Sequence, residues 1–204
     1  MLVPTTNLIP SQEQVLKLLH ETGAWRECHV EFPNGLHAKE YFQMPLVMRY
    51  HGNGRILNVA LSRLLRMEHE VGRALPDCAV VAPAAGGIPV AFGVREALDA
   101  NQIFWAEKDN GRYFFRQYLD VSGLRCILVD DVVRSGKVIN YMVDLIHKAG
   151  AEVIAIGSLV HFNSAPLDIG TIPYQSLVNI DSEFYRPESC PLCRDGIPVE
   201  QVWA

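Results

Sequence analysis

Unbroken apolar runs alternate along this chain with segments in which apolar residues recur every three or four positions. Runs of the first kind are typical of strands that are buried on both faces of a sheet. They cover residues 78–82, 103–106, 126–129 and 153–160. Helical spacing follows the first and the third of them, as expected where a crossover connection joins parallel neighbours. The alternation predicts a doubly wound α/β domain with a mostly parallel sheet.

The two ends of the chain have a different pattern. Ser11 is a candidate N-cap for a helix that runs to Thr22, and two extended pieces around Pro33–Gly35 predict a hairpin. An alternating strand is expected at 174–180, and the tail beyond it is interrupted by prolines. We therefore divide the chain into residues 1–50, an α/β core over 51–180 and a tail over 181–204, and expect both ends to form a small subdomain.

The segment 125–150 is the most informative part of the core. Its apolar strand ends at the acidic pair Asp130 and Asp131, and the polar loop Ser135–Lys137 then opens an amphipathic helix. Free N–H groups at a helix N-terminus can bind a phosphate. Adjacent carboxylates can accept hydrogen bonds from sugar hydroxyls or help to hold Mg²⁺. These pieces suggest a phosphorylated sugar, although an ordinary Asp-rich loop would give the same local pattern.

Two further stretches carry candidate anion contacts. The turn Pro83–Ile88 is rich in glycine and joins a strand to a helix, so it can present N–H groups, as a generic βα turn also would. The stretch 104–117 predicts a hairpin with Asp109–Gly111 at its tip, flanked by the cations Lys108 and Arg112. Such cations are usually exposed to solvent.

The sequence VDDVVRSGKV resembles the phosphoribosyl-diphosphate (PRPP) loop of type I phosphoribosyltransferases, and the longer match is to orotate phosphoribosyltransferases. The resemblance implies that Asp130 and Asp131 face the ribose hydroxyls. It implies that the 5′-phosphate lies in the turn formed by Ser135, Gly136 and Lys137. Arg134 stands where the family usually has Thr, and Val138 where it has Ser or Thr. Two hydroxyl donors are thus missing, and Arg134 is a candidate replacement donor to the phosphate.

The sequence APAAGGIPVA resembles the pyrophosphate loop of the same family. In that family the backbone N–H groups of this loop bind the pyrophosphate. A mobile loop of the family also sends Lys and Arg side chains to the pyrophosphate of a neighbouring subunit's substrate. Together the implied pyrophosphate contacts are Ala84, Ala85, Gly86, Gly87, Lys108, Arg112 and Arg116. Lys108 joins Asp130 and Asp131 as an expected catalytic residue, because the departing diphosphate carries negative charge that must be stabilised.

The segment 23–43 resembles the family's N-terminal hood, in which a turn between two strands covers the base. The resemblance implies a base pocket that includes Gly35, His37 and Phe162. In the family the last strand of the core commonly continues with Asp-Arg, whose arginine contacts orotate. This chain has His161 and Phe162 there, which puts the identity of the base, more than the phosphoribosyl chemistry, in question.

Composition narrows the possible classes of partner. The chain has 204 residues and a net charge of −5, which argues against a general nucleic-acid binder. It has no apolar run of about 18 residues and no pattern of a secretory signal, so we expect a cytoplasmic protein without membrane contact. Cys190 and Cys193 form a C-x-x-C pair. Such a pair can be half of a zinc site or a redox motif, but we favour a structural turn that is stiffened by Pro191.

These observations predict a Mg²⁺-dependent phosphoribosyltransferase of pyrimidine biosynthesis. It would transfer 5-phosphoribose from PRPP to a pyrimidine base, with orotate as the first choice, and release orotidine 5′-phosphate and diphosphate. The Mg²⁺ would arrive with PRPP and could contact Asp130 and Asp131. The family implies a homodimer with shared active sites. The alternatives are a PRPP-binding regulatory or sensor protein, a relative that acts on a different base, and a sugar-phosphate or nucleotide-binding module unrelated to PRPP.

Overall fold

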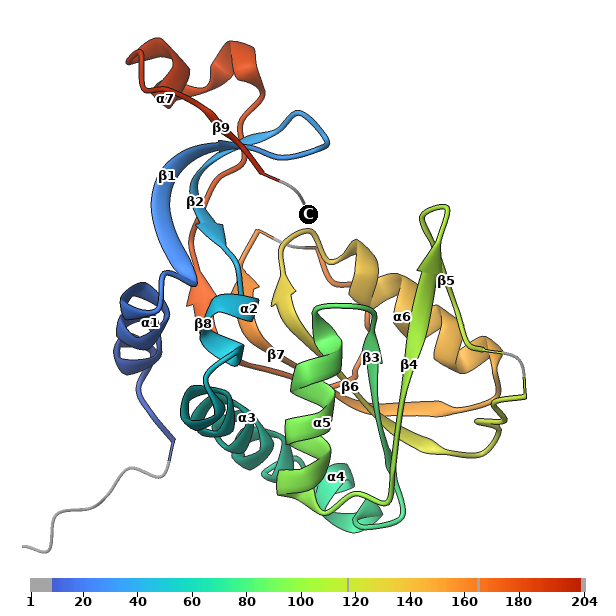
Figure 1. Cartoon of the computed structure of the whole chain (residues 1–204). Helices are drawn as coiled ribbons and strands as arrows, with labels where there is room; N and C mark the ends of the chain where they lie inside the picture. Colours follow the sequence, from blue (N-terminus) through green and yellow to red (C-terminus); the bar gives the residue numbers. More distant parts are fainter. Residues whose placement is uncertain (1–8, 117, 165, 203–204) are drawn as a thin grey trace, which may run out of the picture.

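The computed structural model describes residues 9–116, 118–164 and 166–202, and in these it contains two separate sheets (Figure 1). The six-stranded sheet has the order β5-β4-β3-β6-β7-β8, and the three-stranded sheet has the order β2-β1-β9. The strands are β1 (Trp25–Glu31), β2 (His37–Phe42), β3 (Ala79–Pro83), β4 (Gln102–Asp109), β5 (Arg112–Phe114), β6 (Arg125–Val133), β7 (Glu152–Phe162), β8 (Tyr174–Ile180) and β9 (Glu200–Gln201). The helices are α1 (Gln12–Glu21), α2 (Pro45–Met48), α3 (His51–Arg66), α4 (His69–Ala74), α5 (Gly87–Leu98), α6 (Lys137–Lys148) and α7 (Pro191–Arg194), with a 3₁₀ turn at Pro187–Ser189.

The six-stranded sheet is parallel except at β5, which forms an antiparallel hairpin with β4. From β3 the chain first crosses through α5 to β4 on one side, and later places β6 on the other side of β3. The order of the strands therefore reverses between β3 and β6. In open α/β sheets, ligands bind at the carboxyl ends of the strands at such a switch point.

Helices cover both faces of this sheet, so the predicted doubly wound α/β architecture is confirmed. On one face, α1, α3 and α5 pack against the strands through a large apolar cluster that includes Leu19, Leu61 and Val90. On the other face, α6 packs through Ile139, Met142 and Ile146. No helix in the described part of the chain is long and apolar enough to cross a membrane.

We call the three-stranded sheet and the tail segment 185–202 the hood. It combines both ends of the chain, because β9 pairs in parallel with β1 and the backbone groups of His37 and Tyr185 exchange two hydrogen bonds. Figure 1 shows it beyond the carboxyl ends of β6 and β7. Its own apolar cluster is small, and its buried members in the described chain are Val30, Phe32 and Ala38. Residues 1–8 of the predicted N-terminal segment, and 203–204 of the tail, lie outside the described residues.

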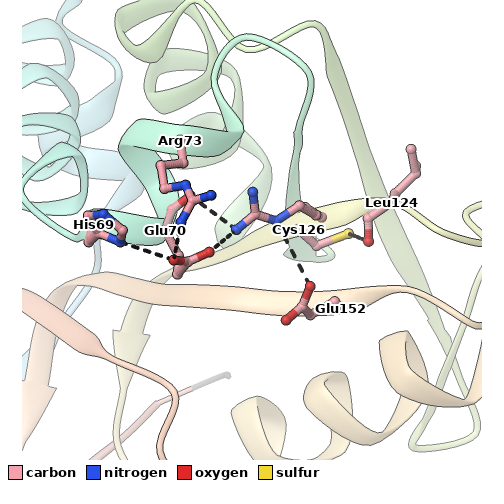
Figure 2. A network of polar contacts seen from close by, with 7 residues as sticks. His69, Glu70, Arg73, Leu124, Cys126 and Glu152 are labelled. Carbon is pink, nitrogen blue, oxygen red and sulfur yellow. Dashed lines mark hydrogen bonds and ion pairs between the residues drawn. The ribbon is translucent and has the colours of Figure 1, made fainter.

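The amino edge of the six-stranded sheet carries a network of ion pairs. Glu70 of α4 accepts hydrogen bonds from His69 and from Arg125, the first residue of β6, and Arg73 lies 4.0 Å away. Arg125 also lies 3.9 Å from Glu152, which begins β7. Figure 2 shows Glu70 pointing toward His69 and Arg73, with Glu152 on the neighbouring strand. The network ties α4 to the start of two central strands.

Candidate functional site

The acidic pair lies at the switch point between β3 and β6. The sequence predicted that the strand would end before the pair, and this is wrong, because β6 continues to Val133 and stays paired with β7 up to His161. On its other side, pairing with β3 ends at Leu128. Asp130 and Asp131 therefore belong to a part of β6 that is paired with β7 on one side and no longer paired with β3 on the other.

The carboxylates of this pair lie directly against the turn between β3 and α5. A Cβ atom added to Gly86 would lie 2.6 Å from Oδ2 of Asp131, and one added to Gly87 would lie 3.2 Å from Oδ1 of Asp130. Only a residue without a side chain fits at either place. The structure thus brings together the predicted ribose contacts and the predicted pyrophosphate loop, which are more than 40 residues apart in the sequence.

Both carboxyl groups are poorly stabilised as anions. Burial raises the pKa of Asp130 well above its usual range, and the neighbouring charge of Asp131 adds to this effect. Burial also raises the pKa of Asp131, although the N–H of Val132 donates to its Oδ1 at 2.7 Å. Within the described chain no ion pair reaches either carboxylate. A buried acid pair of this kind favours a ligand that brings hydroxyl donors or a cation.

The turn after β6 has the geometry expected of a phosphate-binding helix start. Gly136 has a φ of 70°, and a Cβ there would lie 2.3 Å from the carbonyl oxygen of Pro166. Ser135 and Lys137 are exposed beside it. The first N–H groups of α6 have no partner within the helix, so they are free to bind an anion. Asn140 holds the segment after β7 against this turn. Its side-chain amide donates a hydrogen bond to the carbonyl oxygen of Pro166 and accepts one from the N–H of Asp168.

Arg134 lies between the turn and the hood. Its guanidinium carbon is 4.7 Å from the ring centroid of Phe32, in the turn between β1 and β2. Burial lowers the pKa of Arg134, and its neighbours Tyr41, Asp131 and Asp130 oppose that effect. Arg134 is thus a half-buried cation at the end of the acidic strand, with its face against an aromatic ring of the hood. The sequence did not indicate the contact with Phe32.

The pyrophosphate loop offers three of its four predicted amides. The N–H of Ala84 donates to the carbonyl of Ala106 on β4 at 2.9 Å, so it is engaged within the sheet. The peptide bond between Ala84 and Ala85 is cis. Gly87 is the first residue of α5 and Gly86 is its N-cap, directly after Ala85. The first N–H groups of a helix lack partners within it, and the acidic pair lies close to both glycines.

The predicted cations lie on the β4–β5 hairpin, whose tip is Asp109–Gly111 as expected. Lys108 and Arg112 are exposed, and the Nζ of Lys108 is 5.8 Å from the ring centroid of Tyr113. Arg116 donates to Glu107 at 3.1 Å and is likewise exposed. Figure 1 shows the hairpin projecting from the edge of the sheet. The three cations are therefore exposed on, or just after, a hairpin that projects from the sheet.

Tyr113 on the same hairpin was not identified from the sequence. It is buried and packs against Tyr141 of α6, with ring centroids 5.9 Å apart. Burial raises its pKa, and the charges of Asp130 and Asp131 raise it further. Tyr113 thus fixes the hairpin beside the acidic pair. A single tyrosine in an alternating strand carries no signal from which this role could be predicted.

The predicted base contacts are not brought together. Phe162 is 1% exposed and packs against Phe42 and Phe184, because the end of β7 lies in the core beneath the hood. The His37 ring is buried, with Nδ1 2.9 Å from Nε2 of His29 and 3.3 Å from the Sγ of Cys193. Both side chains are therefore held by contacts within the fold, and their place against the base stays a prediction. Of the three predicted base contacts, only Gly35, in the turn of the hood hairpin, has no atom within 4 Å of the place where a Cβ would lie.

His161 occupies the other position of the family's Asp-Arg pair and is also held by the fold. Its Nδ1 lies 3.2 Å from Oδ1 of Asn179 on β8, and its ring packs against Tyr174. Burial lowers the pKa of His161. The end of β7 therefore supplies no cation in place of the family's arginine.

Comparison with known proteins agrees with this geometry. Residues 60–192 match the phosphoribosyl transferase domain. Orotate phosphoribosyltransferases of Thermotoga petrophila (33% identical over 92% of this chain and 96% of the relative) and Carboxydothermus hydrogenoformans (34% over 90% and 93%) are similar to it. The crystal structure of orotate phosphoribosyltransferase from Aeropyrum pernix has a similar fold, with a TM-score of 0.64 and 18% identity over 81% of this chain and 93% of that one.

Proposed function

Since the chain belongs to the phosphoribosyl transferase family and is related to orotate phosphoribosyltransferases over nearly its whole length, we propose that it transfers 5-phosphoribose from PRPP to orotate. The products are orotidine 5′-phosphate and diphosphate, which is a step of pyrimidine biosynthesis. A ring nitrogen of the base attacks C1 of the ribose while the bond from C1 to the diphosphate oxygen breaks. The ring nitrogen loses its proton, and the diphosphate leaves with the bonding electrons.

The observation that carries this proposal is the contact between the acidic pair and the glycine turn. Asp130 is buried and Asp131 half-buried, no ion pair in the described chain reaches either of them, and they lie against Gly86 and Gly87 at the switch point. We assign the two carboxylates to the ribose hydroxyls, which would donate to them. Positive charge develops near C1 as the bond breaks, as in glycoside cleavage, and nearby carboxylates stabilise it.

Mg²⁺ fits the same donor set. Two carboxylates are hard oxygen ligands, and Mg²⁺ is commonly held by one or two of them together with substrate phosphates and water. Burial raises the pKa of both groups, and the charge of Arg134 opposes this effect only in part. When bound with PRPP, the ion would neutralise charge on the diphosphate. Asp130 and Asp131 are the residues that would hold it.

The two ends of PRPP are assigned to two helix starts. We place the 5′-phosphate at the start of α6, where Ser135, Gly136 and Lys137 surround the free N–H groups, and where Arg134 adds a charged donor. We place the diphosphate at the start of α5, against the amides of Ala85–Gly87. Both helices have 12 residues and begin at the same edge of the sheet.

The cations of the β4–β5 hairpin are assigned to the diphosphate of a second subunit. Lys108, Arg112 and Arg116 are exposed on a projecting edge hairpin, so they are available to a neighbouring molecule. We therefore propose a homodimer with shared active sites. We also place the reaction in the cytoplasm, which agrees with five cysteines that form no disulfide.

The direct test incubates the purified full chain with Mg²⁺, PRPP and a panel of bases, and detects nucleotide and diphosphate. Formation of orotidine 5′-phosphate supports the proposal. The second candidate function, a PRPP sensor, is favoured by the missing hydroxyls at Arg134 and Val138 and by the burial of Phe162. PRPP binding in calorimetry without turnover on any base would favour the sensor. Turnover only with another base would correct the substrate.

The shared site has its own test. The variants Asp131→Asn and Lys108→Ala should each be inactive as separate preparations. If the lysine serves the partner's substrate, mixing the two variants and letting their subunits exchange should restore up to about a quarter of the wild-type activity. Random exchange makes about half of the dimers heterodimers, and one of the two sites in each heterodimer is intact. A mixture that stays inactive, although light scattering shows heterodimers, would place Lys108 in its own subunit's site or outside the reaction.

A further inference from the structure

The hood contains a cluster of four metal-ligating side chains from segments far apart in the sequence. His29 lies on β1, His37 begins β2, and Cys190 and Cys193 flank and occupy the short helix α7 of the tail. One ligand atom of each lies within 4.8 Å of those of the other three. The cluster is separate from the crevice at the switch point, and none of its residues has a place in the proposed reaction.

From this arrangement we infer that the hood holds a structural zinc ion, bound by His29, His37, Cys190 and Cys193. Four protein ligands leave no open position, as in structural zinc sites, and the set of two sulfurs and two nitrogens suits tetrahedral Zn²⁺. Two thiolates and one Zn²⁺ would also form a group without net charge, which a buried position requires.

The distances between the ligand atoms fit a tetrahedron around one ion. Zn–S bonds near 2.3 Å and Zn–N bonds near 2.0–2.1 Å imply S···N separations of about 3.6 Å and N···N separations of about 3.4 Å. The Nε2 of His29 lies 3.5 Å from the Sγ of Cys190 and 3.6 Å from that of Cys193. The Nδ1 of His37 lies 3.3 Å from the Sγ of Cys193, and the two nitrogens are 2.9 Å apart. A small outward movement of the two rings completes the fit.

A contact outside the ligand set orients His29. Its Nδ1 lies 2.7 Å from the carbonyl oxygen of Ile197, which can only accept a hydrogen bond. The proton is therefore on Nδ1, and the lone pair on Nε2 points into the cluster. Zinc-bound histidines commonly donate their other N–H in this way. Three of the ligand residues are at most 4% exposed, and only Cys193 reaches the surface.

The hood has a physical need for such an ion. Its apolar cluster has Val30, Phe32 and Ala38 as its buried members, and small subdomains with so little core are commonly stabilised by disulfides or metals. The ion would join the N-terminal hairpin to the tail, in addition to the short β1–β9 pairing, the bridge between His37 and Tyr185 and the contact of His29 with Ile197. It would thereby fix the turn at Phe32, which lies against Arg134.

The first experiment measures metal in the full chain, purified without a histidine tag from zinc-supplemented cells. Elemental analysis should find about one zinc per chain. The single variants Cys190→Ser, Cys193→Ser and His37→Ala should lose most of it. Cys28→Ser is the matched control, because Cys28 lies on the same strand as His29 but outside the cluster, and it should keep the full zinc content.

A second measurement does not depend on variants that fold. Wild-type protein stripped of metal and loaded with Co²⁺ should show the visible bands of tetrahedral cobalt and a thiolate charge-transfer band. Chelation should lower the melting temperature and expose the tail to a protease, since loss of the ion removes its binding energy from the folded state. Wild-type protein without zinc, a Cys190–Cys193 disulfide found by mass spectrometry, or zinc that survives both cysteine variants would each overturn the assignment.

Discussion

The two edges of the six-stranded sheet hold carboxylates in opposite ways. At the carboxyl edge, Asp130 lies buried and Asp131 half-buried against a glycine turn, and no described ion pair reaches them. At the amino edge, Glu70 lies exposed among one histidine and two arginines. The pKa of Asp130 is raised by burial, whereas the pKa of Glu70 is lowered, first by its hydrogen bond with His69 and also by Arg125.

This difference separates a binding site from a structural contact. A carboxylate that serves stability is compensated within the fold, as Glu70 is. A buried carboxylate without compensation lowers the stability of the free protein, so it needs a ligand to balance it. The two edges therefore make opposite predictions for the same kind of substitution, from carboxylate to amide.

The largest effect is expected for Asp131→Asn. The amide keeps the shape of the side chain but removes the charge that strengthens hydrogen bonds from two hydroxyls. Each such bond contributes roughly 1.5–3 kcal/mol, so kcat/KM for PRPP should fall on the order of 100-fold or more. Steady-state kinetics and circular dichroism measure the loss of turnover and the retained fold.

The matched control is Asp144→Asn on the exposed side of α6, where Asp144 lies 3.9 Å from Lys148. It removes one carboxylate near the site and should leave kinetics unchanged, since exposed pairs contribute little. If Asp131→Asn retained the wild-type rate, the assignment of that carboxylate to the ribose would be wrong.

A slightly smaller loss is expected for Gly86→Ala. The new Cβ would lie 2.6 Å from the Asp131 carboxylate and must displace it or the turn. Misplacement of a substrate contact by about 1 Å lowers rates by up to about 100-fold, so we expect kcat/KM to fall roughly 10- to 100-fold. Gly52→Ala, at a helical position with nothing within 4 Å, is the control and should be neutral. Equal activity of the two variants would show that the turn and the acid pair do not act together.

The sequence predicted the architecture of this region well because its signals are local. Apolar runs gave the strands of the core, and the capping box of Ser11 with Gln14 confirmed the first helix. The strand end was misplaced because Asp130 and Asp131 look like loop residues. Pairing with β7 keeps them extended up to Val133, and no local property of the sequence reports a neighbouring strand.

The hood was predicted less well because its order depends on contacts between the two ends of the chain. For Cys190 and Cys193 the sequence favoured a structural turn over half of a metal site, because the other two members of the cluster, His29 and His37, lie on two strands of a distant hairpin. Contacts of the same kind bury His37 and Phe162, which the resemblance places against the base. A resemblance in sequence identifies equivalent positions, but it does not show which side chains the C-terminal tail of this chain covers.

A third substitution tests the stability of the carboxyl edge. The pKa of Asp130 is raised in the folded protein, so the carboxyl group favours folding while protonated and loses this contribution as the pH rises through the folded pKa. Asp130→Asn should therefore raise the melting temperature of the free protein at pH 8, by about 2–4 °C for each kcal/mol relieved. The gain should vanish toward pH 4, near the pKa of an unfolded Asp.

With saturating PRPP and Mg²⁺, the wild type should instead have a higher melting temperature than Asp130→Asn. Only the wild type would gain the full stabilisation by bound ligand. Scanning calorimetry at both pH values, with and without PRPP, measures the four differences. A variant that melts below the wild type in the free state at pH 8 would show that the buried carboxylate is compensated after all.

The smallest effect, with the opposite sign, is expected at the amino edge. The pKa of Glu70 is lowered by His69 and by the arginines, so its contribution to stability is present above the unfolded pKa of about 4.3 and is lost as the pH falls through the folded value. Glu70→Gln should lower the melting temperature by no more than about 2 °C at pH 7, because exposed pairs are screened by water and salt. The difference should shrink in 1 M salt and at pH 3, and kcat/KM for PRPP should not change. A loss of turnover in Glu70→Gln would show that the two edges are coupled through β6, so that charge at one end of the strand sets the position of the acid pair at the other.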